Sequence, residues 1–496
     1  MSRLKRLVVE VYHRSLWQVL PFDNTMTHTS QSLGLSNPMA RVIEEFEFMK
    51  RLKASYRIRV GWTGSALPAV CFAICVLAAL SCRGDSGSLP AWDGVVRDSA
   101  GIEIVENFGT PLWPEGPDWQ FTQELRIGAA TGAPEYQFGR IANYQALSDG
   151  RIVVLDGMER HLRFFSSDGR YERTVGREGQ GPGEFGSGAV WLNLGPGDTL
   201  VVLDRANRRG NVIAPDGTWL ESFSTEPRAG YYNFGWRSSS ATGRLISTQS
   251  PLPQSDGTLS DTLDIVLARG VRGEILDTLA RVPSWLTFIS AEDVAVPQHY
   301  RLFWGHYLCD DDLVLSRRDQ YRFHWYDAEG TLNRIISLAR EPLAMTEKDR
   351  SVFIERWDEY LHDIGVPAER AAEIRSSVRF GDTYPAFTRF TCGPAGTLLV
   401  QRVRPVRDLD VQEQKEIPLG SFSVPPGSLE WDVFDRAGRY LGIVVIPGTE
   451  LVAVPPRCRF SQDRATGRWY MYSTWSDEMG VQHVVRWRVD GRMPEE

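Results

Sequence analysis

Two neighbouring stretches of this chain carry the same residue pattern at a constant offset of 48 residues. The first is RIVVLDGMERHLRFFSSDGRY, residues 151–171, and the second is TLVVLDRANRRGNVIAPDGTW, residues 199–219. The aligned pairs include Val153 with Val201, Asp156 with Asp204, Arg160 with Arg208, Asp168 with Asp216, and Gly169 with Gly217. An internal repeat of this length indicates a small structural unit that is built several times in succession.

Each unit reads as short β-strands joined by tight turns. In the first unit the apolar run at residues 152–155 suits a buried strand, and a polar turn at residues 156–160 follows it. The next strand ends in an Asp-Gly pair, which is a strong hairpin signal, and residues 170–176 form a third strand. With the preceding segment at residues 144–147, the unit has four strands, which predicts the blade of a β-propeller.

Weaker copies of the unit continue toward the end of the chain. They comprise residues 243–248 with 263–276, residues 311–332, residues 396–405 with 430–445, and residues 468–475 with 483–492. Together with the two sharp units they predict an all-β fold, a six-bladed β-propeller of four-stranded antiparallel blades, over residues 95–496. The last blade stops before its outermost strand. The alternating segment at residues 101–107 is expected to supply that strand and so to close the ring.

One insertion, residues 345–378, departs from the β pattern. Thr346 and Asp349 have the spacing of a capping box, and the apolar residues that follow share one helical face as far as Gly365. Pro367 then opens a second short helix. The insertion is expected to be a helical hairpin that packs on the propeller rim, or a lid over the channel mouth.

The stretch VVLDGMERHLRFFSSDGRYERTVGREGQGPGEF resembles the NHL-type repeat, and the region from about residue 95 to 492 resembles the six-bladed β-propeller lipoproteins of bacteria. This resemblance implies that Asp156 and Asp204 lie in loops beside the central channel. The matching position in the fourth blade is Arg317, so a ring of aspartates is incomplete. Members of the family serve as binding platforms or, in some branches, as metal-assisted hydrolases or lyases. The fold alone does not choose among these functions.

The N-terminal region predicts export. Residues 66–81, ALPAVCFAICVLAALS, form the only long apolar run, and a basic segment that begins near Met49 precedes it. The run is short for a bilayer span and suits a signal peptide at residues 49–81. Residues 1–48 are then expected to be a misassigned start or a disordered extension. The alternative is a cytoplasmic extension on a signal anchor.

Cys82 is the expected site of lipidation. The stretch LAALSC, residues 77–82, resembles the lipobox of bacterial lipoproteins, although Ala79 stands where that motif usually has Leu. A lipid on Cys82 would anchor the protein to a membrane, with residues 82–94 as a tether. The predicted location is the bacterial cell envelope, on the periplasmic side or at the outer membrane. A secreted soluble protein is the alternative.

Composition supports a packed β-protein and excludes some functions. Aromatic residues make up 11% of the chain, which suits strand packing. The net charge of −8 argues against nucleic-acid binding, because phosphates require a basic face. After the signal peptide and the lipidated residue are set aside, Cys309, Cys392 and Cys458 remain. At most one disulfide can form among them, and all three are expected to pack as buried thiols.

Candidate binding residues lie in the turns that would border the channel. The stretch GREGQGPGEF, residues 176–185, precedes a strand pattern rather than a helix, so we interpret it as a crossover between blades and not as a phosphate loop. Its expected contact residues are Arg177, Gln180 and Glu184. The other candidates on the channel face are Asp156, Arg160, Asp204, Arg205, Arg208, His306 and Arg317. The arginines of residues 204–209 suit either an anion or an internal pairing.

Recognisable catalytic motifs are absent from the sequence, including G-x-S-x-G, H-E-x-x-H and the P-loop. His306 is interpreted as a core histidine or a channel residue. The acidic run at residues 310–312 suggests Ca²⁺, but successive carboxylates point in different directions. We therefore expect a monomeric binding or scaffold module for an extracytoplasmic protein, peptide or glycan, with no metal or other cofactor. A metal-assisted hydrolase or lyase is the alternative.

Overall fold

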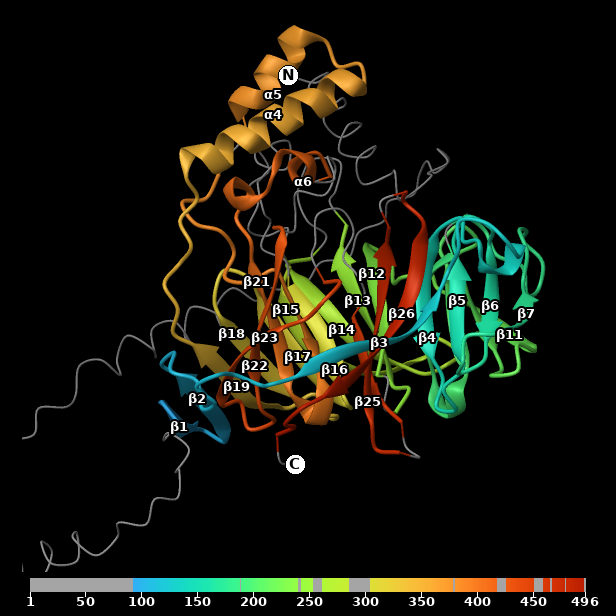
Figure 1. The fold of residues 1–496 in the computed structure, drawn as a ribbon, viewed down its shortest axis with the longest axis horizontal. Helices are drawn as coiled ribbons and strands as arrows, with labels where there is room; N and C mark the ends of the chain where they lie inside the picture. The colour runs from blue at the N-terminus through green and yellow to red at the C-terminus, as the bar shows by residue number, and fades with distance from the viewer. Residues whose placement is uncertain are drawn as a thin grey trace, which may run out of the picture. The chain divides into compact units, whose positions relative to one another are not determined.

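The computed structural model describes residues 92–494, with gaps at 188, 240–241, 253–260, 285–303, 378–379, 417–424, 450–457, 464–465 and 478. These described residues form six sheets, which are the blades of a β-propeller (Figure 1). The predicted all-β, six-bladed fold with a small helical insertion is confirmed. The expected signal peptide at residues 49–81, Cys82 and residues 1–48 lie outside the described residues. Of the helices that the structure describes, none has the length and apolar character that a membrane crossing requires.

Blades 1 to 3 follow one another along the chain, and each begins with its innermost strand. Blade 1 consists of β4 (Ile141–Ala146), β5 (Ile152–Asp156), β6 (His161–Phe165) and β7 (Tyr171–Val175). Blade 2 consists of β8 (Ala189–Leu194), β9 (Leu200–Asp204), β10 (Arg209–Ile213) and β11 (Trp219–Ser224). Blade 3 consists of β12 (Tyr231–Ser238), β13 (Leu245–Pro251), β14 (Leu263–Arg269) and β15 (Ile275–Pro283).

Blades 4 to 6 contain the rest of the ring and three strands from the N-terminal part of the chain. Blade 4 consists of β16 (Trp304–Cys309), β17 (Asp312–Arg317), β18 (Arg322–Tyr326) and β19 (Leu332–Leu338), extended by β2 (Ile102–Asn107) and β1 (Gly94–Ser99). Blade 5 consists of β20 (Arg389–Cys392), β21 (Leu398–Val403), β22 (Gly427–Phe434) and β23 (Tyr440–Val445). Blade 6 consists of β24 (Arg459–Gln462), β25 (Trp469–Ser476), β26 (Gln482–Asp490) and β3 (Gln120–Ile127).

The hydrophobic core lies between neighbouring blades. The first strand of each blade contacts the first strand of the next, and β26 contacts β4 where blade 6 meets blade 1. Strands β5 and β9 are buried at all five positions, because both of their faces pack against other sheets. Leu155 and Phe164 of blade 1, for example, share one cluster with Leu192 and Val202 of blade 2. Burial between blades therefore holds the ring together.

The strand that completes blade 6 is not the predicted one. The sequence pattern assigns residues 101–107 to this place, but β2 pairs in parallel with β19, the outer strand of blade 4. Strand β3 completes blade 6 and runs antiparallel to β26. Both N-terminal segments can form strands, and the outer edge of any blade can accept one. The pattern therefore predicts a strand without selecting its blade.

Between β2 and β3 the chain crosses the outer edge of blade 5 (Figure 1). The amides of Leu112 and Trp113 donate hydrogen bonds to backbone carbonyl groups of β23, at 2.8 and 3.1 Å. Asn107, which is 1% exposed, ends β2, and its side-chain amide donates to backbone carbonyl groups of blades 4 and 5, both at 3.0 Å. The N-terminal segment thus covers the outer strands of blades 4, 5 and 6 in turn.

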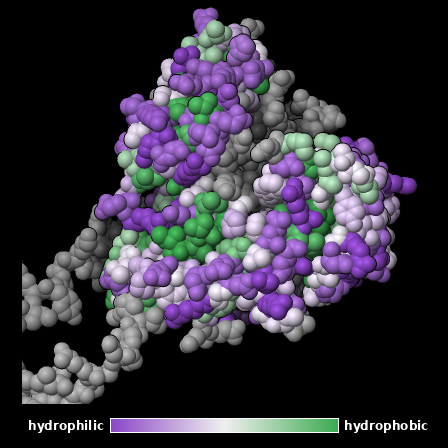
Figure 2. Space-filling model, in the orientation of Figure 1, coloured by the Kyte–Doolittle hydropathy of each residue, from purple (hydrophilic) through white to green (hydrophobic). Residues whose placement is uncertain are grey.

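The predicted helical insertion forms α4 (Glu347–Asp363) and α5 (Ala368–Ser377), at the same end of the propeller as α6 (Val411–Glu416) (Figure 1). The capping box is confirmed, because the amide of Asp349 donates to Thr346 Oγ1 and the amide of Thr346 donates to Asp349 Oδ2. Phe353 and Trp357 pack in the helical core, and the visible outer surface is mostly hydrophilic (Figure 2). Short 3-10 turns are η1 (Pro134–Tyr136), η2 (Pro196–Asp198), η5 (Pro394–Gly396) and η6 (Val406–Asp408).

A disulfide joins Cys309, at the end of β16, to Cys392, at the end of β20. The prediction of buried thiols is therefore wrong for this pair, whereas Cys458 is free and buried as predicted. The two bonded residues are 83 positions apart in the sequence, and their Cα atoms are 5.4 Å apart. Only the ring, which sets the first strands of blades 4 and 5 side by side, brings these cysteines together.

Candidate functional site

The two repeat aspartates hold the turns of their own blades. Asp156 is 0% exposed and accepts hydrogen bonds from four backbone amides of the flanking turns, at 2.9 to 3.1 Å. Asp204 is also 0% exposed and accepts from the amides of Gly186 and Asn207, at 2.6 and 3.2 Å. Both carboxylates stand at the end of a strand, as the repeat predicts, and accept mainly from backbone amides, to which Asp204 adds a hydrogen bond from the side chain of Asn207 at 2.7 Å. Their contacts order the loops between strands.

The arginines of the repeat turns divide into two groups. Arg160 forms an ion pair with Glu178, and Arg208 lies 3.9 Å from Glu226, so each pairs with a glutamate rather than with the aspartate of its repeat. Arg205 behaves differently, because its guanidinium lies over the ring of Trp191 on β8, 5.2 Å from the centroid. Burial lowers the pKa of Arg205. Of these three arginines, Arg205 is the one directed at an innermost strand.

The glycine-rich stretch at residues 176–185 joins β7 to β8, so its interpretation as a crossover between blades is confirmed. Gly179 adopts a φ of 154°, which favours glycine. Arg177 and Glu184 pair with each other at 2.8 Å, and Arg209 of blade 2 donates to the carbonyl oxygen of Gln180 at 2.6 Å. Arg177 and Gln180 are exposed, which leaves them accessible to a partner.

His306 and Arg317 occupy different settings in blade 4. His306 is 7% exposed, with its ring nitrogens 3.4 and 3.5 Å from Thr248 Oγ1 of blade 3. Burial lowers the pKa of His306 to about 3, and the nearby Arg237 charge acts in the same direction, so the ring is neutral at ordinary pH. Arg317 donates from Nε to Asp319 at 2.7 Å. His306 therefore contributes to the packing between blades 3 and 4, and Arg317 pairs within its own turn.

The channel wall, defined as the six innermost strands, carries arginine but no carboxylate. These strands read IANYQA, AVWLNL, YYNFGWRS, WGHYLC, RFTC and RFSQ. They contain Arg237, Arg389 and Arg459 and no Asp, Glu or Lys, although the whole chain has a net charge of −8. Alternate residues of a strand point to opposite faces of its sheet, so the side chains of an innermost strand point alternately toward the two neighbouring blades, as Trp236 does toward blade 2 and Arg237 toward blade 4. The wall is therefore a basic surface within an acidic protein.

Arg237 and Arg459 belong to opposite blades. Arg237 lies on β12 of blade 3 and Arg459 on β24 of blade 6, so two blades separate them in either direction around the ring. Burial lowers the pKa of Arg237, and the charge of Arg459 lowers it further. Both arginines stand on innermost strands of the ring, and their contacts are with the innermost strands of the following blades, β16 and β4. Arg237 is nevertheless exposed to solvent, a combination expected of a side chain that is surrounded by protein and open to water in a channel.

The partners of these two arginines are neutral. Arg459 Nη1 donates to the side-chain oxygen of Gln145 on β4, at 2.9 Å. The guanidinium of Arg237 lies over the ring of Tyr307 on β16, 5.6 Å from its centroid. Among the described residues, neither arginine has a carboxylate within 4.0 Å. The contacts orient the two guanidinium groups without neutralising their charge.

Arg389 extends the basic surface to blade 5. Its Nε donates to Gln401 at 2.6 Å, and its guanidinium lies over the ring of Trp431. Burial lowers the pKa of Arg389 to about 10. Burial and the charge of Arg389 together lower the pKa of Arg318 to about 10 as well. Positive charge thus continues from blade 3 through blades 4 and 5 to blade 6.

Gly235 marks open space in the channel wall. It lies on β12, two residues before Arg237, and a Cβ atom at this position would meet no heavy atom of the described residues within 4 Å. Positions two apart on a strand share a face, so Gly235 lies on the same face of β12 as Arg237. By contrast, a Cβ at Gly305 on β16 would lie 2.7 Å from the ring of Phe390. The space in front of β12 can therefore receive a side chain or a ligand.

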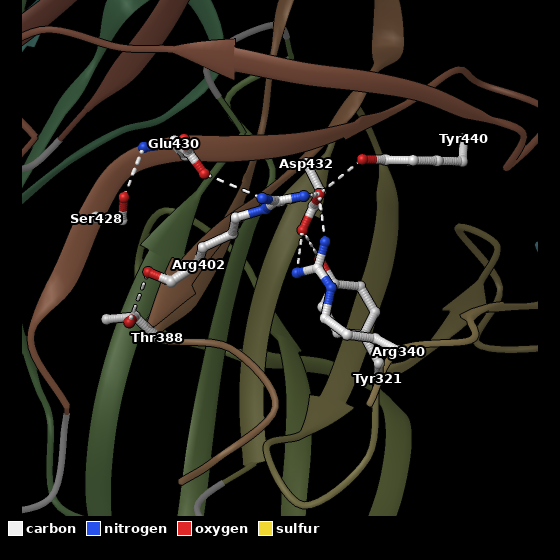
Figure 3. Close-up of polar contacts among 8 residues, drawn as sticks. All are labelled: Tyr321, Arg340, Thr388, Arg402, Ser428, Glu430, Asp432 and Tyr440. Carbon is white, nitrogen blue, oxygen red and sulfur yellow. Dashed lines mark hydrogen bonds and ion pairs between the residues drawn. The ribbon is translucent and has the colours of Figure 1, made fainter. Parts of the chain in front are cut away.

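A second group of arginines forms what we call the blade 4–5 joint. Asp432 on β22 is 0% exposed and accepts from both terminal nitrogens of Arg340, at 2.7 and 2.8 Å, and from Arg402 at 2.9 Å (Figure 3). The hydroxyl groups of Tyr321 and Tyr440 also donate to it, at 2.6 and 3.0 Å. Burial alone would raise the pKa of Asp432, but the two arginines hold it below its ordinary value. One carboxylate thus satisfies two arginines and two tyrosines.

Sequence reasoning missed the channel arginines, although a signal exists. Arg389 and Arg459 both stand in Arg-Phe pairs that begin the first strand of their blades, RFTC and RFSQ. The repeats of blades 5 and 6 are too weak for their first strands to be located by pattern alone, so this correspondence becomes visible only with the strand order. In the described part of the chain, no group of three or more His, Cys, Asp or Glu is arranged to hold a metal ion.

The comparisons with known proteins agree with this architecture. A family model described as "6-bladed beta-propeller" matches residues 134–193, which include blade 1 and most of the first strand of blade 2. The chain folds as a six-bladed propeller. No curated protein sequence matches it.

Several solved propeller structures are similar to this six-bladed propeller. A Bacteroides fragilis protein described as exported is 12% identical, with a TM-score of 0.43, over 79% of this chain and 100% of its own. Regucalcin, a calcium-binding protein of Agrobacterium tumefaciens, is 10% identical, with a TM-score of 0.33, over 75% and 97%. Virginiamycin B lyase of Staphylococcus aureus is 8% identical, with a TM-score of 0.34, over 74% and 99%. At these values no activity, ligand or location is transferred from them.

Proposed function

We propose that this protein is an envelope-anchored β-propeller lipoprotein that binds an extracytoplasmic protein, peptide or glycan through its channel face. The observation that carries the proposal is the channel wall, where Arg237 and Arg459 stand on innermost strands with neutral partners and a Cβ at Gly235 would meet no heavy atom of the described residues within 4 Å. Donor groups on a rigid ring of strands, beside open space, are suited to binding. The exposed crossover residues Arg177 and Gln180 would add contacts at one face.

The anchoring part of the proposal rests on the sequence. The apolar run at residues 66–81 followed by Cys82 supports a lipid-anchored protein on the periplasmic side or at the outer membrane. The acidic net charge supports a partner other than nucleic acid. The expected assembly is a monomer. Replacement of Cys82 by Ser should move the protein from the detergent phase to the aqueous phase of a Triton X-114 partition, and unchanged partition would contradict lipidation.

A plug in the channel tests the binding function. Gly235→Trp places a large ring in the open space in front of β12, where a Cβ meets no neighbour, so the fold should tolerate it. The control is Ser99→Trp, at an exposed position on β1. Each protein would be purified from its native envelope, and solvent extracts would be compared by mass spectrometry.

We expect a compound or peptide that co-purifies with the wild-type and Ser99→Trp proteins and is reduced at least tenfold with Gly235→Trp. The circular dichroism spectra of the three proteins should agree. A ligand that is retained equally by Gly235→Trp would contradict binding in the channel, and so would the absence of any co-purifying species from the wild-type protein.

A further inference from the structure

Arg237 and Arg459 carry positive charge, and their partners among the described residues are neutral. The six innermost strands include three arginines and no acidic residue. Arg237 and Arg459 lie on β12 and β24, the innermost strands of opposite blades, and the charge of Arg459 lowers the pKa of Arg237. Like charges that face one another in a surrounding of reduced dielectric repel. Such an arrangement is unfavourable in the protein alone and becomes favourable when an anion lies between the two charges.

The neutral contacts of the two arginines are suited to such a role. Gln145 accepts from Arg459 Nη1 at 2.9 Å, which leaves the other donors of this guanidinium to a further partner. Tyr307 supports one face of the Arg237 guanidinium, so its in-plane donors remain directed outward. Because the side chains are already oriented, less conformational entropy is lost when they bind.

The blade 4–5 joint provides an internal example of the ligand that such a donor set accepts. In the joint, the Asp432 carboxylate lies between two arginines, Arg340 and Arg402, with hydroxyl groups of two tyrosines beside them. The channel offers a similar set, which is two arginines on opposite strands with Tyr307 beside one of them. A planar carboxylate matches the guanidinium fork with two parallel hydrogen bonds.

We propose that the channel binds a carboxylate group of the ligand between Arg237 and Arg459. This inference rests on the proposed binding function and names the chemical class of the ligand, an acidic compound from outside the chain. The Arg237 fork approaches the carboxylate from blade 3 and the Arg459 fork from blade 6. Arg389 contributes to the positive potential from blade 5.

The test measures the thermal stability of the full-length protein in the presence of simple anions. Succinate, inorganic phosphate and chloride would be compared at one ionic strength and one pH, so that general screening is constant. The proteins are the wild type, Arg237→Gln, Arg459→Gln and the control Arg97→Gln, which removes an exposed arginine on β1. The two channel variants change different blades, so failure of one to fold leaves the other informative.

We expect succinate to raise the Tm of the wild type and of Arg97→Gln by about 1–2 °C over chloride. The rise should be lost in Arg237→Gln and in Arg459→Gln. A larger rise with phosphate than with succinate would overturn the assignment of a carboxylate in favour of a phosphate ligand. An equal response of all four proteins, or no response of the wild type, would overturn anion binding in the channel. If Gly235→Trp still removes a co-purifying ligand, the proposed binding function is supported. Only the assignment of a carboxylate ligand is then contradicted.

Discussion

The blade 4–5 joint and the channel wall both gather arginines, but they give them opposite electrostatic settings. In the joint, Arg340 and Arg402 share the fully buried Asp432 carboxylate (Figure 3). In the channel, Arg237 and Arg459 have neutral partners among the described residues. The joint lies between two sheets, whereas the channel wall is open to solvent at Arg237. Arginine side chains thus stabilise the contact between two blades in the joint, and in the channel they remain able to bind a ligand.

The difference teaches how to distinguish a structural arginine from a functional one in this fold. In the joint the buried arginines share an acidic partner, which offsets the cost of burying their charge. An arginine in the channel remains hydrated, so it tolerates neutral neighbours until an anion arrives.

Removal of the joint carboxylate should have the largest effect. Asp432→Ala leaves Arg340 and Arg402 without their common partner and two tyrosine hydroxyl groups without an acceptor. We expect a loss of roughly 3–5 kcal/mol in the free energy of unfolding. Urea denaturation followed by tryptophan fluorescence measures it. Asp98→Ala, at an exposed position on β1, is the control and should change the free energy little. An equal effect of both substitutions would contradict the role of the joint.

The disulfide tests whether blades 4 and 5 depend on the joint alone. Cys309→Ser with Cys392→Ser removes the covalent link between the innermost strands of the same two blades. We expect a loss of about 2–4 kcal/mol in the free energy of unfolding, mainly because the unfolded chain gains freedom. Cys458→Ser is the matched control, since this thiol is free. If reduction with dithiothreitol leaves the wild type as stable as before, the disulfide contributes nothing to the ring.

Acid should weaken the joint and leave the channel contacts unchanged. The pKa of Asp432 is lowered in the folded state, so its contribution to stability is complete above the unfolded value of about 4 and is lost as the pH falls through the folded value. The facing groups stay protonated in this range, namely Arg340, Arg402, Tyr321 and Tyr440. The free energy of unfolding of the wild type should therefore fall more steeply between pH 5 and 2 than that of Asp432→Asn. Parallel pH profiles would show that the joint does not titrate.

The channel substitutions should have the smallest effect on stability. Arg237→Gln loses one cation–π contact with Tyr307, and Arg459→Gln loses one neutral hydrogen bond to Gln145. Each should change the free energy of unfolding by less than about 1 kcal/mol, because relief of like-charge repulsion offsets part of the loss. Chemical denaturation in chloride alone measures this. A loss as large as that of Asp432→Ala would show that these two arginines stabilise the fold, as Arg340 and Arg402 do. It would contradict the difference between the channel and the joint.

Local patterns predicted much of the fold. The repeat at residues 151–171 and 199–219 located blades 1 and 2, and the capping box at Thr346 located the start of α4. These signals depend on hydrogen bonds and burial within a few residues of one another. The candidate binding residues stay predictions. The prominent Asp156 and Asp204 hold their own turns, and His306 packs between blades.

Long-range pairing was beyond the reach of these patterns. The closing strand was assigned to residues 101–107, but β2 lies on blade 4 and β3 completes blade 6. At the free edge of a sheet, strands pair through their backbone groups almost regardless of their side chains. The alternation of apolar and polar residues therefore does not determine which strand a segment pairs with. The disulfide between Cys309 and Cys392 could not be predicted from their spacing either, because it depends on which blades the ring sets side by side. The channel arginines have no neighbouring motif to single them out.

The sequence by itself determined the blade count, the strand and turn pattern and the helical insertion, because each follows from the periodicity of neighbouring residues. Only the tertiary structure decided which edges the N-terminal strands cover, which cysteines bond and which arginines stand on innermost strands. Those relations depend on closure of the ring, which brings together residues far apart in the chain. Arg237 and Arg459 stand 222 positions apart in the sequence, and the channel gives them a common surface.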